Sequence, residues 1–255
     1  MVALITGGSS GMGLEFARQL ADRGCDLVLV SNREAELQSA RAELLERRPG
    51  CAVKTCFMDL SAADAADRLT RWCEEEGFLP DILINNAGFF FFKELTPEDA
   101  DRVQAMIGLH VATVTRLCLL LGGKMKARGS GYILNMSSMA ARLPEPGITV
   151  YSATKAYLRS FGRSLSFEYK PCGVGVTTVC PAAIATPLYG LSEKWMKVGI
   201  RTGIIHTPKW LVRRALRGMF RRRRLVSPSL MNVYLPPLLA LLPAFIIDIL
   251  WKKFK

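Results

Sequence analysis

The sequence predicts an α/β protein built on one doubly wound parallel sheet. Three observations indicate this fold class: short apolar runs recur along the chain, longer amphipathic segments separate them, and a glycine-rich turn follows the first run. Strands that alternate with helices at this spacing form right-handed βαβ units, whose parallel strands are covered on both faces. With 255 residues and no internal repeat, the chain has the length of one large domain.

The apolar runs are rich in leucine and β-branched residues, as buried parallel strands must be. We expect strands at 2–5, 26–31, 52–58, 81–85, 131–136 and 174–180. We expect helices at 12–23, 33–48, 62–77, 97–127, 150–169 and 207–222. Thr96-Pro97 and Thr207-Pro208 mark two helix starts, because threonine is a good N-cap and proline is favoured at the first helical position.

The composition excludes several classes of protein. Half of the residues are hydrophobic, which excludes a disordered chain. The seven cysteines form no Cys-x-x-Cys pair and only two histidines are present, which disfavours a metal site, a thioredoxin-type redox pair and a secreted disulfide framework. Reduced thiols favour a cytoplasmic location. Residues 1–5 already form the first expected strand, so we expect no leader peptide.

The turn after the first strand is a candidate phosphate site. Glycines let the backbone approach a phosphate closely, and the N-terminus of the next helix offers free N–H groups. A plain tight turn is the alternative, and the glycine spacing differs from G-x-G-x-x-G. The candidate dinucleotide contacts in this segment are Thr6, Gly7, Ser9, Ser10, Gly11, Met12 and Gly13.

The end of the second strand is expected to meet the adenosine ribose. A carboxylate there is typical of NAD sites, but this chain has Ser31, Asn32 and Arg33. An arginine can pair with a 2′-phosphate, so the sequence favours NADP(H) over NAD(H), with a solvated helix-start arginine as the alternative. Asp59 and Leu60, after the third strand, are candidate adenine contacts, although Asp59 is equally an ordinary loop carboxylate or cap.

Tyr151 and Lys155 are four residues apart on one expected helix, so they share a face. An ammonium beside a phenol stabilises the phenolate, which makes Tyr151 a candidate proton donor to a carbonyl oxygen. Such a pair also arises by chance, so a third group is needed. Ser138 follows the fifth strand, at the sheet edge where ligands bind, and its hydroxyl can polarise a substrate oxygen, with Ser137 as the alternative.

Together these residues resemble the short-chain dehydrogenase/reductase family over about residues 1–190. The motifs that carry the resemblance are the 6–13 turn, Asn85-Asn86-Ala87-Gly88, Ser138, Tyr151-x-x-x-Lys155 and the stretch 181–186. The resemblance implies a single Rossmann-type domain that forms a homodimer or homotetramer. It also implies hydride transfer between a nicotinamide cofactor and a carbonyl or alcohol.

The resemblance assigns roles as well. Tyr151 would be the acid/base, Ser138 would orient the substrate, and Lys155 would bind the nicotinamide ribose and tune the tyrosine. The remaining implied cofactor contacts are Asn86, Ala87, Gly88, Pro181, Ala182, Ile184 and Thr186. Two positions depart from the family pattern: Ala182 replaces glycine, and His110 replaces an asparagine that holds a relay water. Three alternatives are open for His110: it substitutes for that asparagine, it shifts the pH optimum because histidine titrates near neutrality, or it forms a purely structural hydrogen bond.

The substrate is expected to be hydrophobic. Phe89 to Phe92 follow the fourth strand, and they either pack under the next helix or line an apolar cleft. Residues 187–206 correspond to the family's variable substrate lid and contain no cluster of acids or bases. These features favour a ketone or alcohol of the 3-ketoacyl, ketosphingoid or steroid type.

The C-terminal part of the chain is strongly basic. From Lys209 to Lys255 eleven basic residues stand against one acid, and 225–247 contain 23 uncharged residues interrupted by prolines. We divide the chain into a catalytic domain, 1–226, and an apolar, basic tail, 227–255. The tail is expected on the cytoplasmic face of a membrane, with burial in a subunit interface or over the pocket and a true span as alternatives. Nucleic acid is disfavoured as a partner.

The predicted function is therefore NADP(H)-dependent reduction of a lipid-like ketone, or oxidation of the corresponding alcohol. An NAD-linked alcohol dehydrogenase and a non-catalytic cofactor-binding scaffold are the alternatives. The presence of Ser138, Tyr151 and Lys155 argues against the scaffold.

Overall fold

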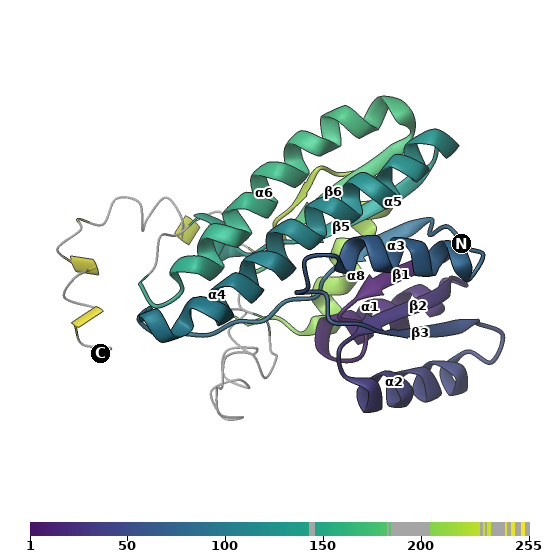
Figure 1. Cartoon of the computed structure of the whole chain (residues 1–255). Coiled ribbons are helices and arrows are strands. Elements are labelled where there is room, and N and C mark those ends of the chain that lie inside the picture. The colour runs from purple at the N-terminus through teal and green to yellow at the C-terminus, as the bar shows by residue number, and fades with distance from the viewer. Residues whose placement is uncertain are drawn as a thin grey trace.

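A computed structural model describes residues 1–142, 146–182, 184 and 205–229, together with 232, 234–235, 243, 246–247 and 251–252. These residues form a seven-stranded sheet with the order β3-β2-β1-β4-β5-β6-β7. Every strand pair is parallel, and helices cover both faces of the sheet (Figure 1). The predicted doubly wound α/β fold is confirmed.

The six expected strands are all present, and a seventh extends the sheet. The strands are β1 (Val2–Thr6), β2 (Asp26–Ser31), β3 (Val53–Phe57), β4 (Ile82–Asn85), β5 (Gly131–Met136), β6 (Val174–Val179) and β7 (Leu225–Val226). β7 pairs with Thr178 and Val179 at the end of β6. We did not predict β7, because two residues are too few to form a periodic pattern.

The hydrophobic core has two layers, one on each face of the sheet. One face is covered by α1 (Gly11–Ala21), α2 (Glu34–Arg47) and α8 (Pro208–Phe220), whose buried side chains include Phe16, Leu37 and Leu216. The other face is covered by α3 (Ala65–Glu75), α5 (Val114–Arg128) and α6 (Thr149–Tyr169). Each leucine that leaves water here contributes about 1.5–3 kcal/mol.

The helix expected at 97–127 is divided into several parts. It begins with a 3-10 turn at Pro97–Asp99, continues as α4 (Ala100–Ile107), passes through a π-helical turn at Gly108–Thr113 and ends as α5. The turn begins at Gly108, where a Cβ would lie 2.7 Å from the Ser61 carbonyl oxygen, so only glycine fits this close approach. The π turn directs His110 inward, where it is 1% exposed.

The stretch Pro97–Arg128 is also long and apolar enough to cross a membrane. Leu117, Cys118 and Leu121 are fully buried in the core cluster that includes strand and α6 residues. These contacts are those of a core helix in a globular domain.

Both proline-marked helix starts are confirmed. The Thr96 hydroxyl and the Asp99 carboxylate form a reciprocal capping box before the 3-10 turn. The Thr207 hydroxyl accepts a hydrogen bond from the Trp210 N–H at 3.2 Å, which caps α8.

The strand order reverses at β1, which lies between β2 and β4. In open parallel sheets, ligands bind beyond the carboxyl ends of the strands at such a reversal. The carboxyl ends of β1, β4 and β5 carry Thr6, Asn85 and Met136. The proposed limits of the lid (187–206) and the tail (227–255) stay predictions, because most of both segments lies outside the described residues.

Candidate active site

The glycine-rich turn requires glycine for its backbone conformation at Gly7 and Gly11 and for close packing at Gly13. Gly7 and Gly11 have φ values of 64° and 53°, in the left-handed region. A Cβ on Gly13 would lie 1.8 Å from the Gly7 carbonyl oxygen, so only glycine fits there. The turn therefore packs directly onto the first turn of α1 and leads to the helix N-terminus, as a cradle for a pyrophosphate requires.

Thr6 joins the ends of β1 and β4. Its hydroxyl accepts hydrogen bonds from the backbone N–H groups of Asn86 and Ala87, both at 3.0 Å. The Asn86 side-chain amide in turn donates to the Thr6 carbonyl oxygen at 3.1 Å. These bonds hold the predicted contacts at 86–88 beside the glycine turn. Asn85 has a different place: its amide is buried and donates to Asn135.

The corner at the end of β2 brings together three of the predicted residues. The Ser31 hydroxyl lies 2.9 Å from the Ser9 hydroxyl and accepts from the Arg33 N–H at 3.3 Å. The Arg33 guanidinium extends into solvent and pairs with Glu36 at 2.7 Å. Glu36 also accepts from Ser9 at 3.2 Å, and the Arg33 hydrogen bond lowers the pKa of its carboxyl.

Glu36 was not predicted from the sequence. It is one acidic residue among several in an ordinary amphipathic helix, so no pattern distinguishes it.

Asp59 forms a local turn. Its carboxylate accepts from the backbone N–H and the hydroxyl of Ser61, at 2.9 and 2.8 Å. Leu60 is buried, and its carbonyl oxygen accepts from Thr113. This geometry supports the capping alternative for Asp59, and adenine contacts at both residues stay predictions.

One cavity of about 60 Å³ unites the predicted catalytic residues with parts of the predicted cofactor site. Residues from the helix α6, the strand ends and the π turn meet there. Its lining consists of Met12, Asn86, Gly88, Phe89, His110, Met136, Ser137, Ser138, Tyr151, Lys155, Pro181, Ala182 and Ile184.

Lys155 is the buried cation of this cavity. Its side chain donates from Nζ to the Met136 carbonyl oxygen at 3.0 Å, and Nζ lies 5.5 Å from the centre of the Tyr151 ring. Burial lowers the pKa of Lys155 to about 8. A charged amine at this distance stabilises a tyrosinate, because a buried charge is only weakly screened.

The two serines after β5 have different bonds. Ser137 donates its hydroxyl proton to the Lys155 carbonyl oxygen at 2.7 Å. The Ser138 oxygen accepts from the Ala140 N–H at 3.2 Å, and no described residue takes its proton. Ser138 can therefore donate to a substrate oxygen, whereas the proton of Ser137 is already used.

His110 connects two walls of the cavity. Its Nε2 accepts from the Phe89 N–H at 3.2 Å, and its Nδ1 lies 3.0 Å from the Thr154 hydroxyl. Because Thr154 donates its own proton to the Tyr151 carbonyl oxygen at 2.8 Å, Nδ1 must carry the imidazole proton.

The imidazole is therefore neutral. Burial, followed by repulsion from Lys155, lowers the pKa of His110 to about 2. The expectation that His110 titrates near neutrality is wrong, because the side chain is removed from solvent and both of its nitrogens are bonded. Thr154 was not predicted, since a threonine within a helix carries no sequence signal.

The four phenylalanines divide into two pairs. The Phe89 and Phe90 rings lie 5.9 Å from His110 and 5.1 Å from Tyr151, between ring centres. Phe91 instead lies under the Arg102 guanidinium, and Phe92 lies 6.2 Å from Trp251. Phe89 lines the cavity and Phe90 lies against Tyr151, which agrees with the cleft alternative for these two residues. Phe92 is 54% exposed, so it does not pack under the next helix.

The segment after β6 forms the last wall. Ala182 and Ile184 are buried, and Ile184 pairs with His206 as an isolated parallel bridge. The Pro181 carbonyl oxygen accepts from the Met139 N–H at 2.8 Å, which joins this wall to the loop after β5. Thr186, the last predicted cofactor contact, lies outside the described residues.

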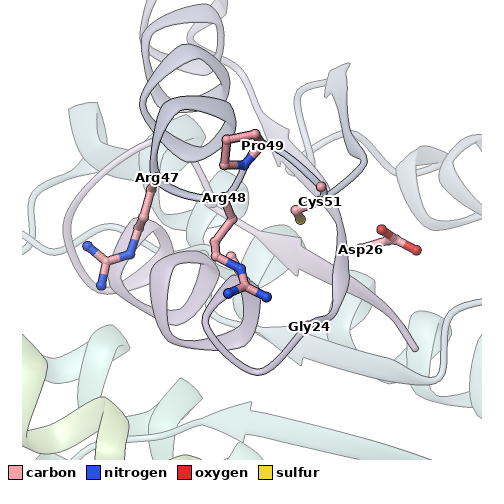
Figure 2. A pocket seen from close by; sticks show the side chains of 8 residues that line it. Gly24, Asp26, Arg47, Arg48, Pro49 and Cys51 are labelled. Atoms are coloured by element: carbon pink, nitrogen blue, oxygen red, sulfur yellow. The ribbon is translucent and has the colours of Figure 1, made fainter.

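A larger hollow of about 360 Å³ lies at the opposite edge of the sheet, where β2 begins (Figure 2). Arg47 beside it is paired with Asp22 at 2.7 Å. Asp26 accepts from the Ala52 N–H at 2.9 Å. Arg47 and Asp26 are thus used in holding the fold, and this hollow lies at the end of the sheet away from Tyr151.

A family model described as short chain dehydrogenase matches residues 1–197. Together with the fold and the convergence of Ser138, Tyr151 and Lys155, this match shows that the chain belongs to the short-chain dehydrogenase/reductase family. The predicted resemblance and the predicted oxidoreductase class are confirmed.

Individual relatives point to similar chemistry. The chain is 29% identical to the very-long-chain 3-oxoacyl-CoA reductase of Mus musculus, over 91% of this chain and 81% of that protein. It is 34% identical to the 17-beta-hydroxysteroid dehydrogenase type 3 of Mus musculus over 73% of this chain, but spans 61% of that protein. A solved short-chain dehydrogenase from Sphingobium yanoikuyae in complex with NADPH superposes with a TM-score of 0.79 and 32% identity, covering 90% of this chain and 88% of that one.

Proposed function

We propose that this protein uses NADP(H) to reduce a ketone on a hydrophobic, lipid-like substrate, or to oxidise the corresponding secondary alcohol. The observation that carries the proposal is the cavity in which Tyr151, Lys155 and Ser138 converge next to the glycine turn. The 3-oxoacyl and steroid activities named for the relatives agree with it.

The residues present fit a dinucleotide. The cradle at Gly7, Gly11 and Gly13 would hold the pyrophosphate, because it leads to the N-terminus of α1 and the space beside Gly11 is open. Asn86 to Gly88, Lys155 and Ile184 would line the nicotinamide end. When bound, the cofactor supplies the hydride.

The chain's own groups handle the proton. Tyr151 donates its phenol proton to the carbonyl oxygen of the substrate, and Lys155 stabilises the phenolate that forms. Ser138 donates a hydrogen bond to the same oxygen and polarises the carbonyl. In the oxidative direction Tyr151 accepts the alcohol proton.

The preference for NADP(H) rests on the corner after β2. Ser9, Ser31 and Arg33 lie together there and offer two hydroxyls and a guanidinium to a 2′-phosphate. The structural neighbour from Sphingobium yanoikuyae holds NADPH.

The hydrophobic substrate preference rests on Phe89 and Phe90, whose rings lie beside the catalytic residues. The test is NADPH oxidation with a panel of long-chain 3-ketoacyl thioesters, keto-sphingoids, steroid ketones, small polar ketones and sugars, with Tyr151→Phe as the inactive control. We expect turnover of the apolar ketones. Activity confined to the small polar ketones and sugars would overturn the substrate class.

We further propose a homodimer or homotetramer assembled through the outer faces of α5 and α6. Leu119 is 55% exposed there, and Tyr157 stacks on Phe161 at 5.6 Å on a neighbouring surface. Light scattering of the wild type and Leu119→Glu tests this. We expect the wild type to be a dimer or tetramer and the Leu119→Glu variant to dissociate. A monomeric wild type would refute the proposal.

For the tail we propose peripheral contact with the cytoplasmic face of a membrane. The support is the 23-residue uncharged stretch 225–247 between basic clusters. Flotation of the full-length protein on liposomes should exceed that of a 1–226 truncation, which keeps β7, and equal flotation would count against a role for the tail.

A further inference from the structure

The outward face of α8 carries only basic residues among those exposed to solvent. Lys209, Arg213, Arg217 and Arg221 are spaced four apart, so they form one stripe along the helix, with Arg214 beside it. The opposite face is buried in the core through Leu211, Val212, Ala215, Leu216 and Met219. Residues 207–229 contain eight basic side chains and no acidic one.

The stripe continues into Arg222, Arg223 and Arg224, which are all exposed. The sheet edge holds their backbone: the Arg223 and Arg224 carbonyl oxygens accept from Thr177 at 2.7 Å and from Thr178 at 3.0 Å. Arg222 has a φ of 53°, the only non-glycine residue with positive φ among those described. The charges are therefore displayed from a fixed backbone.

These cations have no acidic partner within the described part of the chain. Their contacts are with aromatic rings instead: Arg214 lies 4.4 Å from the centre of the Trp210 ring, and Arg224 lies 3.9 Å from that of Phe167. A hollow of about 540 Å³ opens beside Arg222 to Arg224 and Lys170. The positive charge is left for an external anion.

We propose that the α8 stripe and Arg222–Arg224 form a docking face for an anionic phospholipid membrane. The stripe runs from Lys209 to Arg221, about 18 Å along a helix, which is longer than one phosphate group. Phe167, 57% exposed, adds apolar surface beside the cations. The uncharged segment 225–247 follows in the sequence.

Other partners fit this face less well. A second copy that met this face through a two-fold axis would bring a like-charged stripe against this one, which repels. A single-stranded nucleic acid needs open aromatic faces for stacking, whereas Trp210 is stacked on His206 at 3.8 Å and lies under Arg214.

The docking face adjoins the active site. His206, directly before the cap of α8, pairs with Ile184, which lines the catalytic cavity. If the proposed lipid-like substrate is correct, docking through α8 would hold the cavity wall close to the headgroups from which such a substrate enters. The docking itself does not depend on the identity of the substrate.

The test uses the full-length protein and vesicles of phosphatidylcholine with or without phosphatidylserine. The variant Arg213→Gln/Arg217→Gln/Arg221→Gln removes three charges from the stripe. The control Arg23→Gln/Arg48→Gln/Arg71→Gln removes three exposed charges elsewhere. We expect the wild type and the control to bind phosphatidylserine vesicles in a salt-sensitive manner, and the stripe variant to bind roughly 100-fold more weakly.

Equal binding by the stripe variant and the control would overturn the proposal. So would equal, salt-insensitive binding to both kinds of vesicle, or displacement from vesicles by an oligonucleotide at lower phosphate concentration than by competing vesicles. NADPH oxidation with a soluble ketone is measured in parallel. The stripe variant should retain it, and a failure of turnover in all three proteins would concern the reductase proposal alone.

Discussion

Two corners of the nucleotide crevice hold their positive charges in opposite ways. The Arg33 side chain is 68% exposed and pairs with Glu36 on the same helix turn. Lys155 is 5% exposed, has no described carboxylate partner and donates to a backbone carbonyl. Water screens the first charge, whereas the second acts in a site of low effective dielectric constant. The exposed corner should therefore adjust preference between cofactors, and the buried corner should determine rate and stability.

The largest effect is expected at the phenol of Tyr151, which lies beside Lys155. Tyr151→Phe removes the proton donor without changing the ring, so kcat should fall about 10²–10⁴-fold while the thermal midpoint changes little. Steady-state NADPH oxidation and thermal unfolding measure the two quantities. A variant with more than a tenth of the wild-type kcat would show that another group supplies the proton.

Lys155→Met tests the cost of the buried charge. The folded-state pKa of about 8 lies below the ordinary value of 10.5, so the protonated amine destabilises the fold below pH 8, by up to roughly 3 kcal/mol. This penalty fades as the pH rises from about 8 toward 10.5.

The Lys155→Met variant should therefore lose activity yet unfold at a higher temperature than the wild type at pH 7. The difference should shrink near pH 10. Denaturant unfolding at both pH values measures it, and a variant less stable than the wild type at pH 7 would show that the bond to Met136 outweighs desolvation.

His110 should lower the free energy of unfolding as the pH falls below about 6.5. It is neutral in the fold, with a pKa near 2, but protonates below about pH 6.5 when unfolded. The unfolded state then binds the extra proton, so the free energy of unfolding should fall by about 2 kcal/mol between pH 6.5 and 5.

Denaturant unfolding across this pH range compares the wild type with His110→Asn and His206→Asn. Most of the acid-induced loss should disappear in His110→Asn. The His206 variant is the matched control, because the pKa of His206 is lowered too but its ring is only partly buried. Should all three proteins lose stability equally, His110 would not be the group that titrates.

The smallest effect is expected at the exposed corner. Arg33→Ala should weaken NADPH binding about tenfold and leave NADH binding unchanged, because only the 2′-phosphate distinguishes the two cofactors. Glu36→Gln, which removes the competing carboxylate, should strengthen NADPH binding. Fluorescence titration measures both affinities, and equal losses for NADPH and NADH would place Arg33 outside the 2′-phosphate site.

Local patterns predicted the fold and the candidate catalytic residues that the fold brings together around one cavity. Strands buried on both faces leave continuous apolar runs, and the glycine turn, Ser138 and the Tyr151–Lys155 spacing are short, contiguous signals. Glu36, Thr154 and the Met136 carbonyl left no such signal, because their roles depend on which side chains approach them in space.

The linear order of residues thus determined which groups are available for catalysis: a phenol and an amine one helical turn apart, a hydroxyl after a strand, and glycines where a helix begins. Folding decided how those groups are charged and bonded. His110 is neutral and bonded at both nitrogens, and the pKa of Lys155 is lowered, because the packing of α6 and the π turn removes both side chains from water. Protonation depends on solvent and neighbours in three dimensions, and these are set by contacts between residues far apart in the chain.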